Sequence, residues 1–528
     1  MTGTPTIGID LGTTNSAIAH AEGGNIDILP NVTGDRTTPS VVAFDSRAEK
    51  ALVGKQATNQ AVNHPKRTVF SVKRYMGSDQ TILIGGRNYE FTPEELSGII
   101  LKKLKQDAEA YLGQTIESAV ITVPAYFNDR QRQATKHAGA LAGFDADRII
   151  NEPTAACLAY GLQTARDKTV LVYDLGGGTF DSSLIEIDSG IFEVVATNGD
   201  TQLGGDDWDM AIVEWLEERI EREHGISIEG TLAAEERIFD AAQQAKHDLS
   251  TRQTATITIP FLEFEGDTYD IEATLRRDTF ERMTRDLLDK TINLCEALFE
   301  EAGYSERSID EILLVGGATR MPQIKKRITE YFDREPSKRI NPDEAVAIGA
   351  AAQAAIINHE ILPASTPGGT TAPTANTERT PATQTVNNTV LLDVAPQSLG
   401  VGLIDLENNE PYYHVIIERN TPIPVRNSYM TTTAQDSQTE IEIPVYQGDS
   451  DRLEENELLD EFELGPLPKR PEGVANIEVK FMLDENGILN VSARDVDHEI
   501  GDEIEIQSVF GFTDKELSIM QQNLPEIQ

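Results

Sequence analysis

The sequence predicts a duplicated α/β fold followed by a smaller antiparallel β domain. From about residue 1 to residue 360, strand-like runs alternate with amphipathic helical patterns. Within that part, a motif of strand, glycine turn and strand occurs twice. Beyond residue 389 the apolar residues alternate with period two, and helical patterns almost disappear. These observations divide the chain into a large α/β part and a β part.

Composition limits the classes of partner. The chain has 528 residues, which is too long for one hydrophobic core, and 39% of them are hydrophobic. Its 88 acidic and 45 basic residues give a formal net charge of −43, which would repel a nucleic-acid backbone. We therefore expect no nucleic-acid partner. An acidic excess spread along the chain is typical of a halophilic protein, because salt screens the self-repulsion.

Cysteine usage and hydropathy indicate a soluble, cytoplasmic protein. The two cysteines, Cys157 and Cys295, lie in helical patterns and are expected in the core. No basic or long apolar stretch precedes the strand-like run that begins at Thr6. The most apolar run, residues 345–357, is too short to cross a bilayer, so we expect no membrane partner.

Local signals place the elements in order. Thr92-Pro93-Glu94-Glu95 predicts a capped helix start, and residues 341–344 are expected to open an apolar helix in the same way. We take residues 1–360 as one domain. Residues 361–389, rich in Thr, Pro and Gly, are expected to form a flexible tether.

The remaining chain predicts an antiparallel β domain over residues 395–509, preceded by a short apolar linker at 390–394. Period-two runs occur at 441–445, 477–483 and 504–506, and Asn486-Gly487 predicts a hairpin turn. Residues 510–528 are expected to hold only a short helix from Thr513 to about Asn523.

The repeated motif carries the chemistry. Residues 7–16 are echoed by residues 172–181, and each copy has an aspartate, Asp10 or Asp174, before a glycine turn. Glycines bring backbone N–H groups close to phosphate oxygens, and the aspartate can face a hydrated cation. Two facing copies would clamp a polyphosphate with its Mg²⁺. The alternative is a pair of hairpins whose glycines only satisfy turn geometry. Neither a P-loop nor a dinucleotide fingerprint is present.

With residues 314–322, the two copies resemble the phosphate-1, phosphate-2 and adenosine motifs of the actin-like ATPase fold. Val69-Phe70-Ser71-Val72-Lys73-Arg74 and the stretches 123–129, 150–156, 199–205 and 340–345 resemble the DnaK, or heat-shock-protein-seventy, family. The similarity covers almost the whole chain. It implies an actin-like, two-lobed ATPase domain with a central cleft, followed by a β-sandwich that binds peptides. The implied activity is that of an ATP-hydrolysing chaperone.

The resemblance also implies roles for individual residues. Lys73 would offset charge on the γ-phosphoryl group, Glu152 would help to place the attacking water, and Asp174 and Thr179 would complete the catalytic set. Asp10 and Asp174 would hold Mg²⁺ through water, and Asp181 with Asp10 would help to bind K⁺. Lys73 could instead be a solvated cation beside Arg74. The implied ATP/ADP-binding residues are Gly12, Thr13, Thr14, Asn15, Gly176, Gly177, Gly178, Thr179, Gly204, Gly205, Gln243, Lys246, Ser250, Gly316, Gly317, Ala318, Arg320 and Asp343.

One nucleotide position departs from the family pattern. Gln243 stands where a glutamate near the ribose is usual, so a neutral amide replaces an acceptor for two sugar hydroxyls. The hypothesis is weaker nucleotide binding or faster release.

In this family an apolar linker and a lobe rotation couple the two domains. Leu391, Leu392 and Asp393 match that linker, and Pro124 and Arg132 look like the switch residues. The linker residues could equally form the first strand of the β domain. The peptide groove would be lined by Val401, Ile404, Thr432, Ala434, Ile441 and Ile443, although each could simply belong to the sandwich core.

Further departures and alternatives remain. Thr431 stands where a phenylalanine is expected, and the long helical lid is missing, either naturally or because the chain is cut. Implied partners are unfolded polypeptides, a J-domain co-chaperone and a nucleotide exchange factor. A small-molecule kinase or an actin-like filament subunit would share the duplicated core, but neither would need the β domain.

Overall fold

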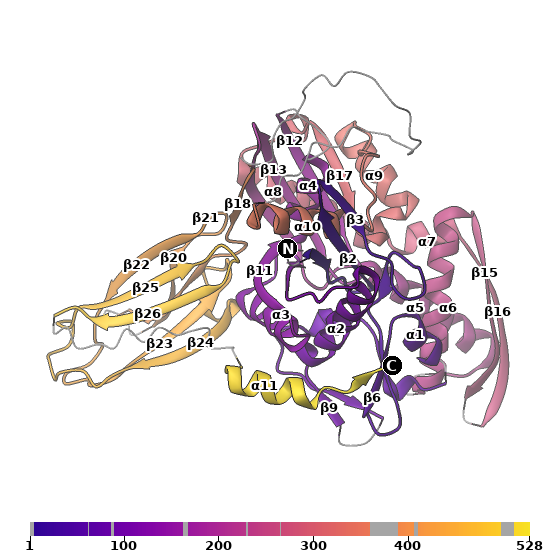
Figure 1. The fold of residues 1–528 in the computed structure, drawn as a ribbon, viewed down its shortest axis with the longest axis horizontal. Coiled ribbons are helices and arrows are strands. Elements are labelled where there is room, and N and C mark those ends of the chain that lie inside the picture. The colour runs from indigo at the N-terminus through magenta and orange to yellow at the C-terminus, as the bar shows by residue number, and fades with distance from the viewer. Residues whose placement is uncertain are drawn as a thin grey trace.

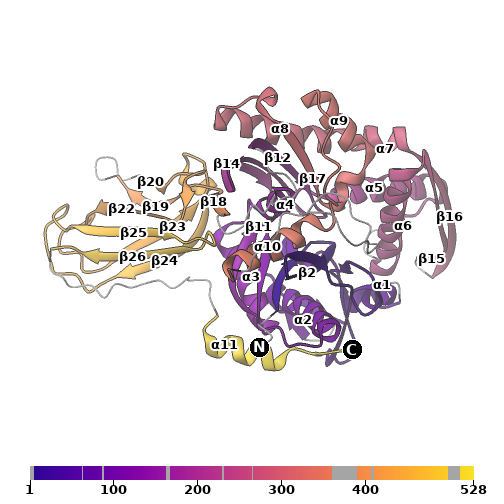
Figure 2. The same ribbon diagram turned by 45° about the horizontal axis from the view of Figure 1, so that its top comes forward.

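The computed structural model describes residues 5–61, 63–85, 89–161, 167–228, 231–264, 266–359, 389–405, 410–497 and 512–528. The predicted tether, apart from residue 389, and the expected strand at 504–506 lie outside these ranges. Figures 1 and 2 show a two-lobed α/β body from which a β domain projects to one side.

Each lobe is built on a sheet with the same strand plan. In both, the strand before the glycine turn has a parallel neighbour on one side and an antiparallel hairpin partner on the other. The orders β10-β1-β2-β3 and β17-β12-β13-β14 therefore confirm the predicted duplication. Lobe I contains β1 (Thr6–Asp10), β2 (Asn15–Glu22), β3 (Asn25–Ile28), β4 (Thr38–Pro39), β10 (Ser118–Val123) and β11 (Asp145–Asn151); lobe II contains β12 (Lys168–Leu175), β13 (Phe180–Asp188), β14 (Ile191–Asp200) and β17 (Glu311–Val315).

Two helices, α4 (Glu152–Gly161) and α10 (Ala345–Ile357), pack against each other at the centre of the body. Their backbones approach so closely that a Cβ on Gly349 would lie 1.7 Å from the carbonyl oxygen of Ala155. Only glycine fits such an approach. The alanine-rich run is thus a buried helix, and Cys157 on α4 lies in the core as expected.

The two predicted helix starts have different outcomes. Helix α2 (Pro93–Leu112) begins as expected, because Thr92 Oγ1 accepts a hydrogen bond from the Glu95 N–H and the Glu95 carboxylate accepts one from the Thr92 N–H. The prediction for residues 341–344 is wrong, since α10 begins at Ala345 and has no side-chain cap. These residues form a turn instead, in which Asp343 binds Arg320.

Additional elements surround the two sheets. Lobe I has α1 (Lys55–Ala61), α3 (Asp129–Leu141), β5 (Val42–Phe44), β6 (Lys50–Val53), β7 (Thr68–Val69), β8 (Ile82–Ile84), β9 (Tyr89–Phe91), η1 (Pro65–Arg67) and η2 (Val72–Tyr75). Lobe II has α5 (Gly205–His224), α6 (Leu232–Thr251), α7 (Arg277–Met283), α8 (Arg285–Ala302), α9 (Pro322–Phe332), β15 (Thr254–Phe264), β16 (Asp267–Arg276), η3 (Glu306–Ser308) and η4 (Gly317–Arg320).

The β domain consists of two antiparallel sheets, ordered β20-β19-β23-β24 and β22-β25-β26. The predicted hairpin is confirmed, with Gly487 at φ 71° between β25 and β26. The predicted C-terminal helix is also present. The elements are β18 (Val390–Val394), β19 (Leu399–Ile404), β20 (Pro411–Ile417), β21 (Pro422–Ile423), β22 (Val425–Thr431), β23 (Ile441–Gln447), η6 (Leu453–Glu455), β24 (Glu457–Leu464), β25 (Ile477–Leu483), β26 (Leu489–Asp495), α11 (Asp514–Asn523) and β27 (Glu526–Ile527).

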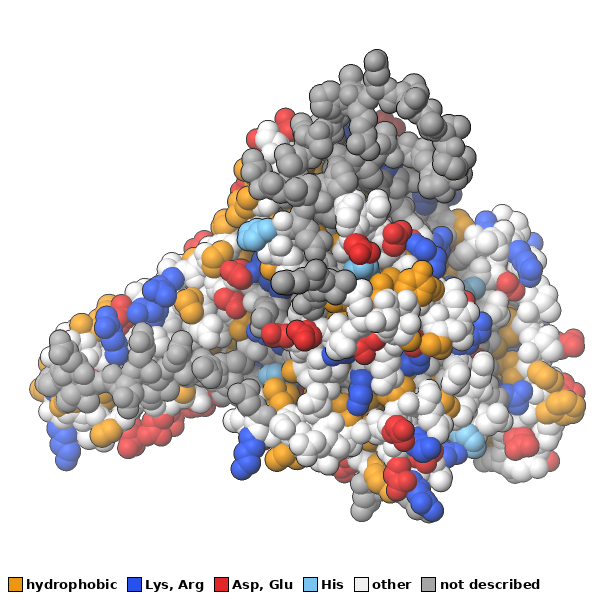
Figure 3. Space-filling model, in the orientation of Figure 1, with side chains coloured by type: hydrophobic (Ala, Val, Ile, Leu, Met, Phe, Trp, Pro, Cys, Tyr) orange, Lys and Arg blue, Asp and Glu red, His pale blue; other side chains and the backbone are white. Residues whose placement is uncertain are grey.

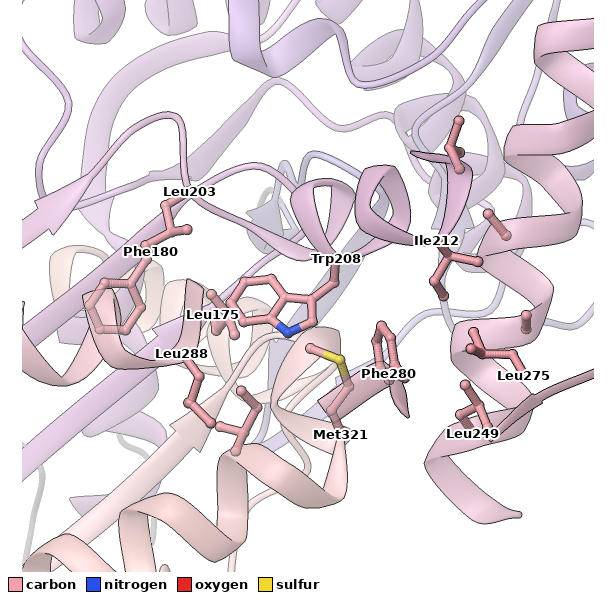
Figure 4. Packing of buried hydrophobic residues seen from close by; sticks show 14 of the residues in the cluster. Leu175, Phe180, Leu203, Trp208, Ile212, Leu249, Leu275, Phe280, Leu288 and Met321 are labelled. Atoms are coloured by element: carbon pink, nitrogen blue, oxygen red, sulfur yellow. The ribbon is translucent and has the colours of Figure 1, made fainter. Parts of the chain in front are cut away.

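The core of lobe II is organised around a tryptophan on α5. Trp208 is fully buried beside Leu175 and Phe180, which come from the strands on either side of the second glycine turn (Figure 4). Cys295 on α8 is buried in the same cluster. The other tryptophan, Trp215, also lies on α5 but is only partly buried.

The two tryptophans provide a matched test of this core. We expect Trp208→Ala to lower the free energy of unfolding by about 3–5 kcal/mol, because it removes a large buried ring and leaves a cavity. Trp215→Ala should cost clearly less, since its ring is only partly buried. Urea denaturation followed by circular dichroism measures both, and equal losses would contradict the assignment of Trp208 as the centre of the core.

Candidate functional site

The two glycine turns face each other across a cleft of about 560 Å³. A Cβ on Gly177 would lie 2.0 Å from Thr14 Oγ1, and one on Gly178 would lie 2.9 Å from Thr13 Cγ2. Both copies of the repeat therefore meet, as the motif predicted. Of the nucleotide-site residues, the cleft is lined by Asp10, Gly12, Thr13, Thr14, Asn15, Lys73, Glu152, Asp174, Gly176, Gly177, Thr179, Gly205, Gln243, Lys246, Ser250, Gly316, Gly317, Ala318, Arg320 and Asp343.

A cluster of carboxylates surrounds one buried lysine at the floor of the cleft. Lys73 is 4% exposed and forms an ion pair with Glu152, so it is not a solvated surface cation. Burial, and then repulsion from Glu152, raises the pKa of Asp10 to about 7 and that of Asp181 to about 7. The same causes raise the pKa of Asp174 well above its ordinary value. Negative charge exceeds positive charge here, and a cation would reduce the repulsion.

The carboxylates are not arranged to hold a bare metal ion. In the part of the chain that the structure describes, no three histidine, cysteine or acidic side chains are close enough to do so. Asp181 Oδ1 already accepts a hydrogen bond from the Tyr126 N–H at 2.9 Å. The donor set fits a cation that keeps its water shell, since the carboxylates can accept hydrogen bonds from bound water.

Several of the predicted nucleotide-binding residues in the cleft have protein partners. Lys246 Nζ donates to Asp209 at 2.5 Å and to the Gly205 carbonyl at 2.8 Å. Gln243 also hydrogen-bonds Asp209, whose pKa burial raises to about 6. The Gln243 amide thus serves a carboxylate in this structure, and Gln243→Glu would bring two acids together.

Sequence reasoning missed residues that hold the cleft together. Asp209 fixes Lys246, and Asp206 accepts a hydrogen bond from Ser71 of the other lobe at 2.8 Å. Arg74 reaches across the cleft to Asp206 and Asp207. The acidic first turn of α5 was a local signal, but its partners lie more than a hundred residues away in the chain.

Arg132 connects lobe I to the β domain. Its buried guanidinium donates to the Ala125 and Phe127 carbonyls, to Asn151 Oδ1 and to the carbonyl of Asn486 on the β25–β26 turn. Pro124, the other predicted switch residue, is buried at the end of β10 and its carbonyl accepts from the Phe127 N–H.

The predicted linker forms β18, which joins both domains. It pairs in parallel with β14, placing Leu391 opposite Phe192 and Leu392 opposite Glu193. Its last residues pair with β21 of the β domain. Asp393 is partly buried and accepts a hydrogen bond from Thr154 Oγ1 at 3.1 Å. The segment therefore forms a strand that pairs with both domains, and its role as the interdomain linker stays a prediction.

The predicted peptide-groove residues occupy two different environments. Val401 and Ile443 are buried in the sandwich core, and Ile441 packs against that core. Ile404, at the end of β19, is 52% exposed, and Thr432 and Ala434 are half-buried just after β22. The structure does not bring all six side chains to one accessible surface, because Val401 and Ile404, three residues apart on β19, lie on opposite faces.

Comparisons with known proteins show the family to which the chain belongs. A profile of the Hsp70 protein family matches residues 6–528. The chain is 46% identical over 519 residues to the chaperone protein DnaK of Halobacterium salinarum, covering 98% of this chain and 77% of that protein. It is 48% identical over 494 residues to DnaK of Thermotoga petrophila, covering 93% and 78%.

The chain belongs to the Hsp70 family. Its fold is accordingly the actin-like ATPase domain followed by a β-sandwich, and its activity is that of an ATP-hydrolysing chaperone. The kinase alternative is not favoured. In the described residues of this Hsp70 protein, no helix is long and apolar enough to cross a membrane.

The docked β domain buries a titratable group of lobe I. Asp129, at the start of α3, accepts a hydrogen bond from the Leu489 N–H at 2.7 Å, and its own N–H donates to Gln447. Burial raises its pKa to about 7, while nearby Arg132 lowers it and Asp484 raises it. In an undocked arrangement this carboxyl would be exposed and near its ordinary value of 3.8.

We therefore expect docking to weaken as the pH rises from about 4 to about 7. The docked state binds a proton that the undocked state releases in this range, so the docking constant should fall by up to about tenfold per pH unit. Docking can be measured by energy transfer between two dyes. The dyes are attached to cysteines that replace the exposed Tyr111 of lobe I and the exposed Val474 of the β domain. In Asp129→Asn, the logarithm of the docking constant should fall less steeply with pH, by about one unit per pH unit at most. An unchanged pH dependence would contradict the assignment of Asp129.

Proposed function

We propose that this Hsp70 protein binds Mg²⁺ATP between its two glycine turns and hydrolyses it with Lys73 and Glu152. The observation that carries the proposal is the buried Lys73–Glu152 pair within a surplus of carboxylates, at the point where both turns meet. Such a site has one positive group for the phosphoryl oxygens and acids to receive a hydrated cation.

Each part of the site has a distinct role in this proposal. Backbone N–H groups and hydroxyls of Thr13, Thr14 and Thr179 hold the phosphates, and Asp10 and Asp174 accept hydrogen bonds from the water shell of Mg²⁺. Mg²⁺ supplies charge neutralisation and orientation of the phosphates. Asp181 with Asp10 serves K⁺. Glu152 orients the attacking water while Lys73 stabilises charge on the γ-phosphoryl oxygens.

The Lys73–Glu152 ion pair bears on how hydrolysis begins. While the two are paired, Lys73 has fewer N–H donors left for a phosphate oxygen, and Glu152 has fewer acceptor sites left for water. We propose that the arriving phosphates take Lys73 and thereby release Glu152 for the water. One exchange of partners thus prepares both groups.

The β domain would hold extended apolar segments of unfolded polypeptides. Ile404, Thr432, Ala434 and Ile441 would contact the segment, and Val401 and Ile443 would support them from the core. A strand-edge mode of binding accepts many sequences, because main-chain hydrogen bonds supply much of the affinity. A J-domain co-chaperone, a nucleotide exchange factor and a salt-rich cytoplasm belong to this proposal as well.

Lys73→Ala tests the catalytic assignment. We expect its single-turnover ATP hydrolysis to fall by about 10²-fold or more, because a preorganised charge at the reacting phosphoryl group is lost. ATP binding, measured by calorimetry, should persist. Lys326→Ala, which removes an exposed lysine of α9, serves as the control. Hydrolysis at the normal rate in Lys73→Ala would refute the proposed site.

Nucleotide-dependent peptide release tests the coupling. We expect ATP to accelerate release of a fluorescent apolar peptide by about tenfold or more relative to ADP. The reason is that ATP would favour the docked arrangement of the domains, in which the peptide site would be open. Asp393→Ala should abolish most of this difference by removing the contact with Thr154. Asp451→Ala, at an exposed loop carboxylate, should not. Equal release in ATP and ADP by the unchanged protein would contradict coupling.

A further inference from the structure

The C-terminal residues of the sequence lie on lobe I, far along the chain from the elements they contact. In Figures 1 and 2, α11 lies below α2 and α3, and the chain continues toward β6. The ring of Phe512 packs edge-on against His137 of α3, with centroids 5.4 Å apart. Thr513 caps α11 through a capping box with Glu516. The helix is therefore locally defined as well as docked.

Apolar side chains anchor this segment in the lobe I core. Leu524 is 9% exposed and belongs to the same cluster as Val42, Val53 and Val72. Leu517, Met520 and Ile527 pack against that cluster, whereas Ile519 on the same helix is 50% exposed. The helix thus presents one face to lobe I and another to solvent.

The segment ends as a strand added to a sheet. β27 pairs in parallel with β6, placing Glu526 opposite Lys50 and Ile527 opposite Ala51. The Glu526 N–H donates to the Glu49 carbonyl at 3.1 Å, and the Gln528 N–H donates to the Ala51 carbonyl at 3.0 Å. In the described sheet, β5 occupies the other side of β6. Residues 526–528 therefore satisfy an edge that would otherwise expose its hydrogen-bonding groups.

The same sheet leads to the catalytic lysine. Its order is β27-β6-β5-β7, and Val42 of β5 lies between Val53 of β6 and Val69 of β7. Beyond β7 comes Ser71, which has φ 49° and donates to Asp206 across the cleft. Val72, in the cluster that holds Leu524, directly precedes Lys73. The added strand and the Lys73 segment thus share one sheet and one core.

We propose that the edge of β6 is a strand-acceptor site filled by the chain's own residues 526–528, and that filling it positions Lys73 for ATP hydrolysis. The occupant is an extended segment whose Glu526 faces Lys50. Leu524 and Ile527 are positioning residues, because they act on Lys73 only through the sheet and its core. The inference rests on the proposed catalytic role of Lys73.

The strand pairing is tested in the full chain by Lys50→Cys/Glu526→Cys. Opposed strand residues are within disulfide reach, so oxidation should join them rapidly and intramolecularly. Cys157 and Cys295 are buried and do not compete. Lys50→Cys/Ile519→Cys, with its second cysteine on the exposed face of α11, should form the bond much more slowly. Equal rates in the two pairs, or no bond in the first, would overturn the acceptor site.

The coupling to Lys73 is tested with Leu524→Asp and its matched control Ile519→Asp. We expect Leu524→Asp to slow single-turnover hydrolysis by at least about fivefold, since displacing a catalytic group by ~1 Å can cost up to about 10²-fold. ATP affinity should stay unchanged, which a general loss of structure would not allow. Ile519→Asp should hydrolyse ATP at the normal rate.

Rescue separates positioning from destabilisation. Oxidised Leu524→Asp carrying the Lys50→Cys/Glu526→Cys bond should recover at least half of the lost rate, because the disulfide restores the strand without Leu524. Leu524→Asp hydrolysing like Ile519→Asp, or a formed disulfide without recovery, would overturn the coupling. Failure of the proposed function is distinguishable, since Lys73→Ala would then hydrolyse normally whatever the strand does.

Discussion

The arrangement of the two domains depends on one strand that hydrogen-bonds to both. β18 extends the lobe II sheet along β14 and at the same time pairs with β21 of the β domain. Strand pairing has a fixed register, so Asp393 is directed inward to Thr154 rather than toward solvent. A partly buried carboxylate needs partners, and Asp393 finds Thr154 only while this register holds. Docking is thus specified by polar contacts as well as by apolar burial.

A short path joins this strand to the chemistry. Asn151 accepts a hydrogen bond from Arg132, Glu152 pairs with Lys73, and Thr154 donates to Asp393. All three lie at the junction of β11 and α4, within one helical turn. If Lys73 and Glu152 exchange partners as proposed, a shift of Glu152 would act on the residues that hold β18. The buried, closely packed α4 has little room to deform, so it would transmit such a shift.

Charge is distributed differently on the surface and in the cleft. Figure 3 shows acidic and basic side chains interspersed over the visible face. Ions can screen that surface charge, and the chain's net charge of −43 makes this screening important. In the cleft, the carboxylates are buried and repel one another, which salt in the solvent relieves far less. A cation bound in the cleft would reduce the repulsion among these carboxylates directly.

The sequence by itself determined the local elements and the repeated turn, because these depend on residues close together in the chain. The glycines near Asp10 and Asp174, the Thr92 cap and the Asn486-Gly487 hairpin all formed as predicted. Helix α10 begins at Ala345, after its local signal at residues 341–344, and those residues form a turn in which Asp343 binds Arg320. Only the tertiary structure decided that Asp209 holds Lys246, that Ser71 reaches Asp206 and that residues 526–528 join β6. Each of these contacts joins segments distant in the chain, and a pattern of neighbouring residues holds no information about such pairings.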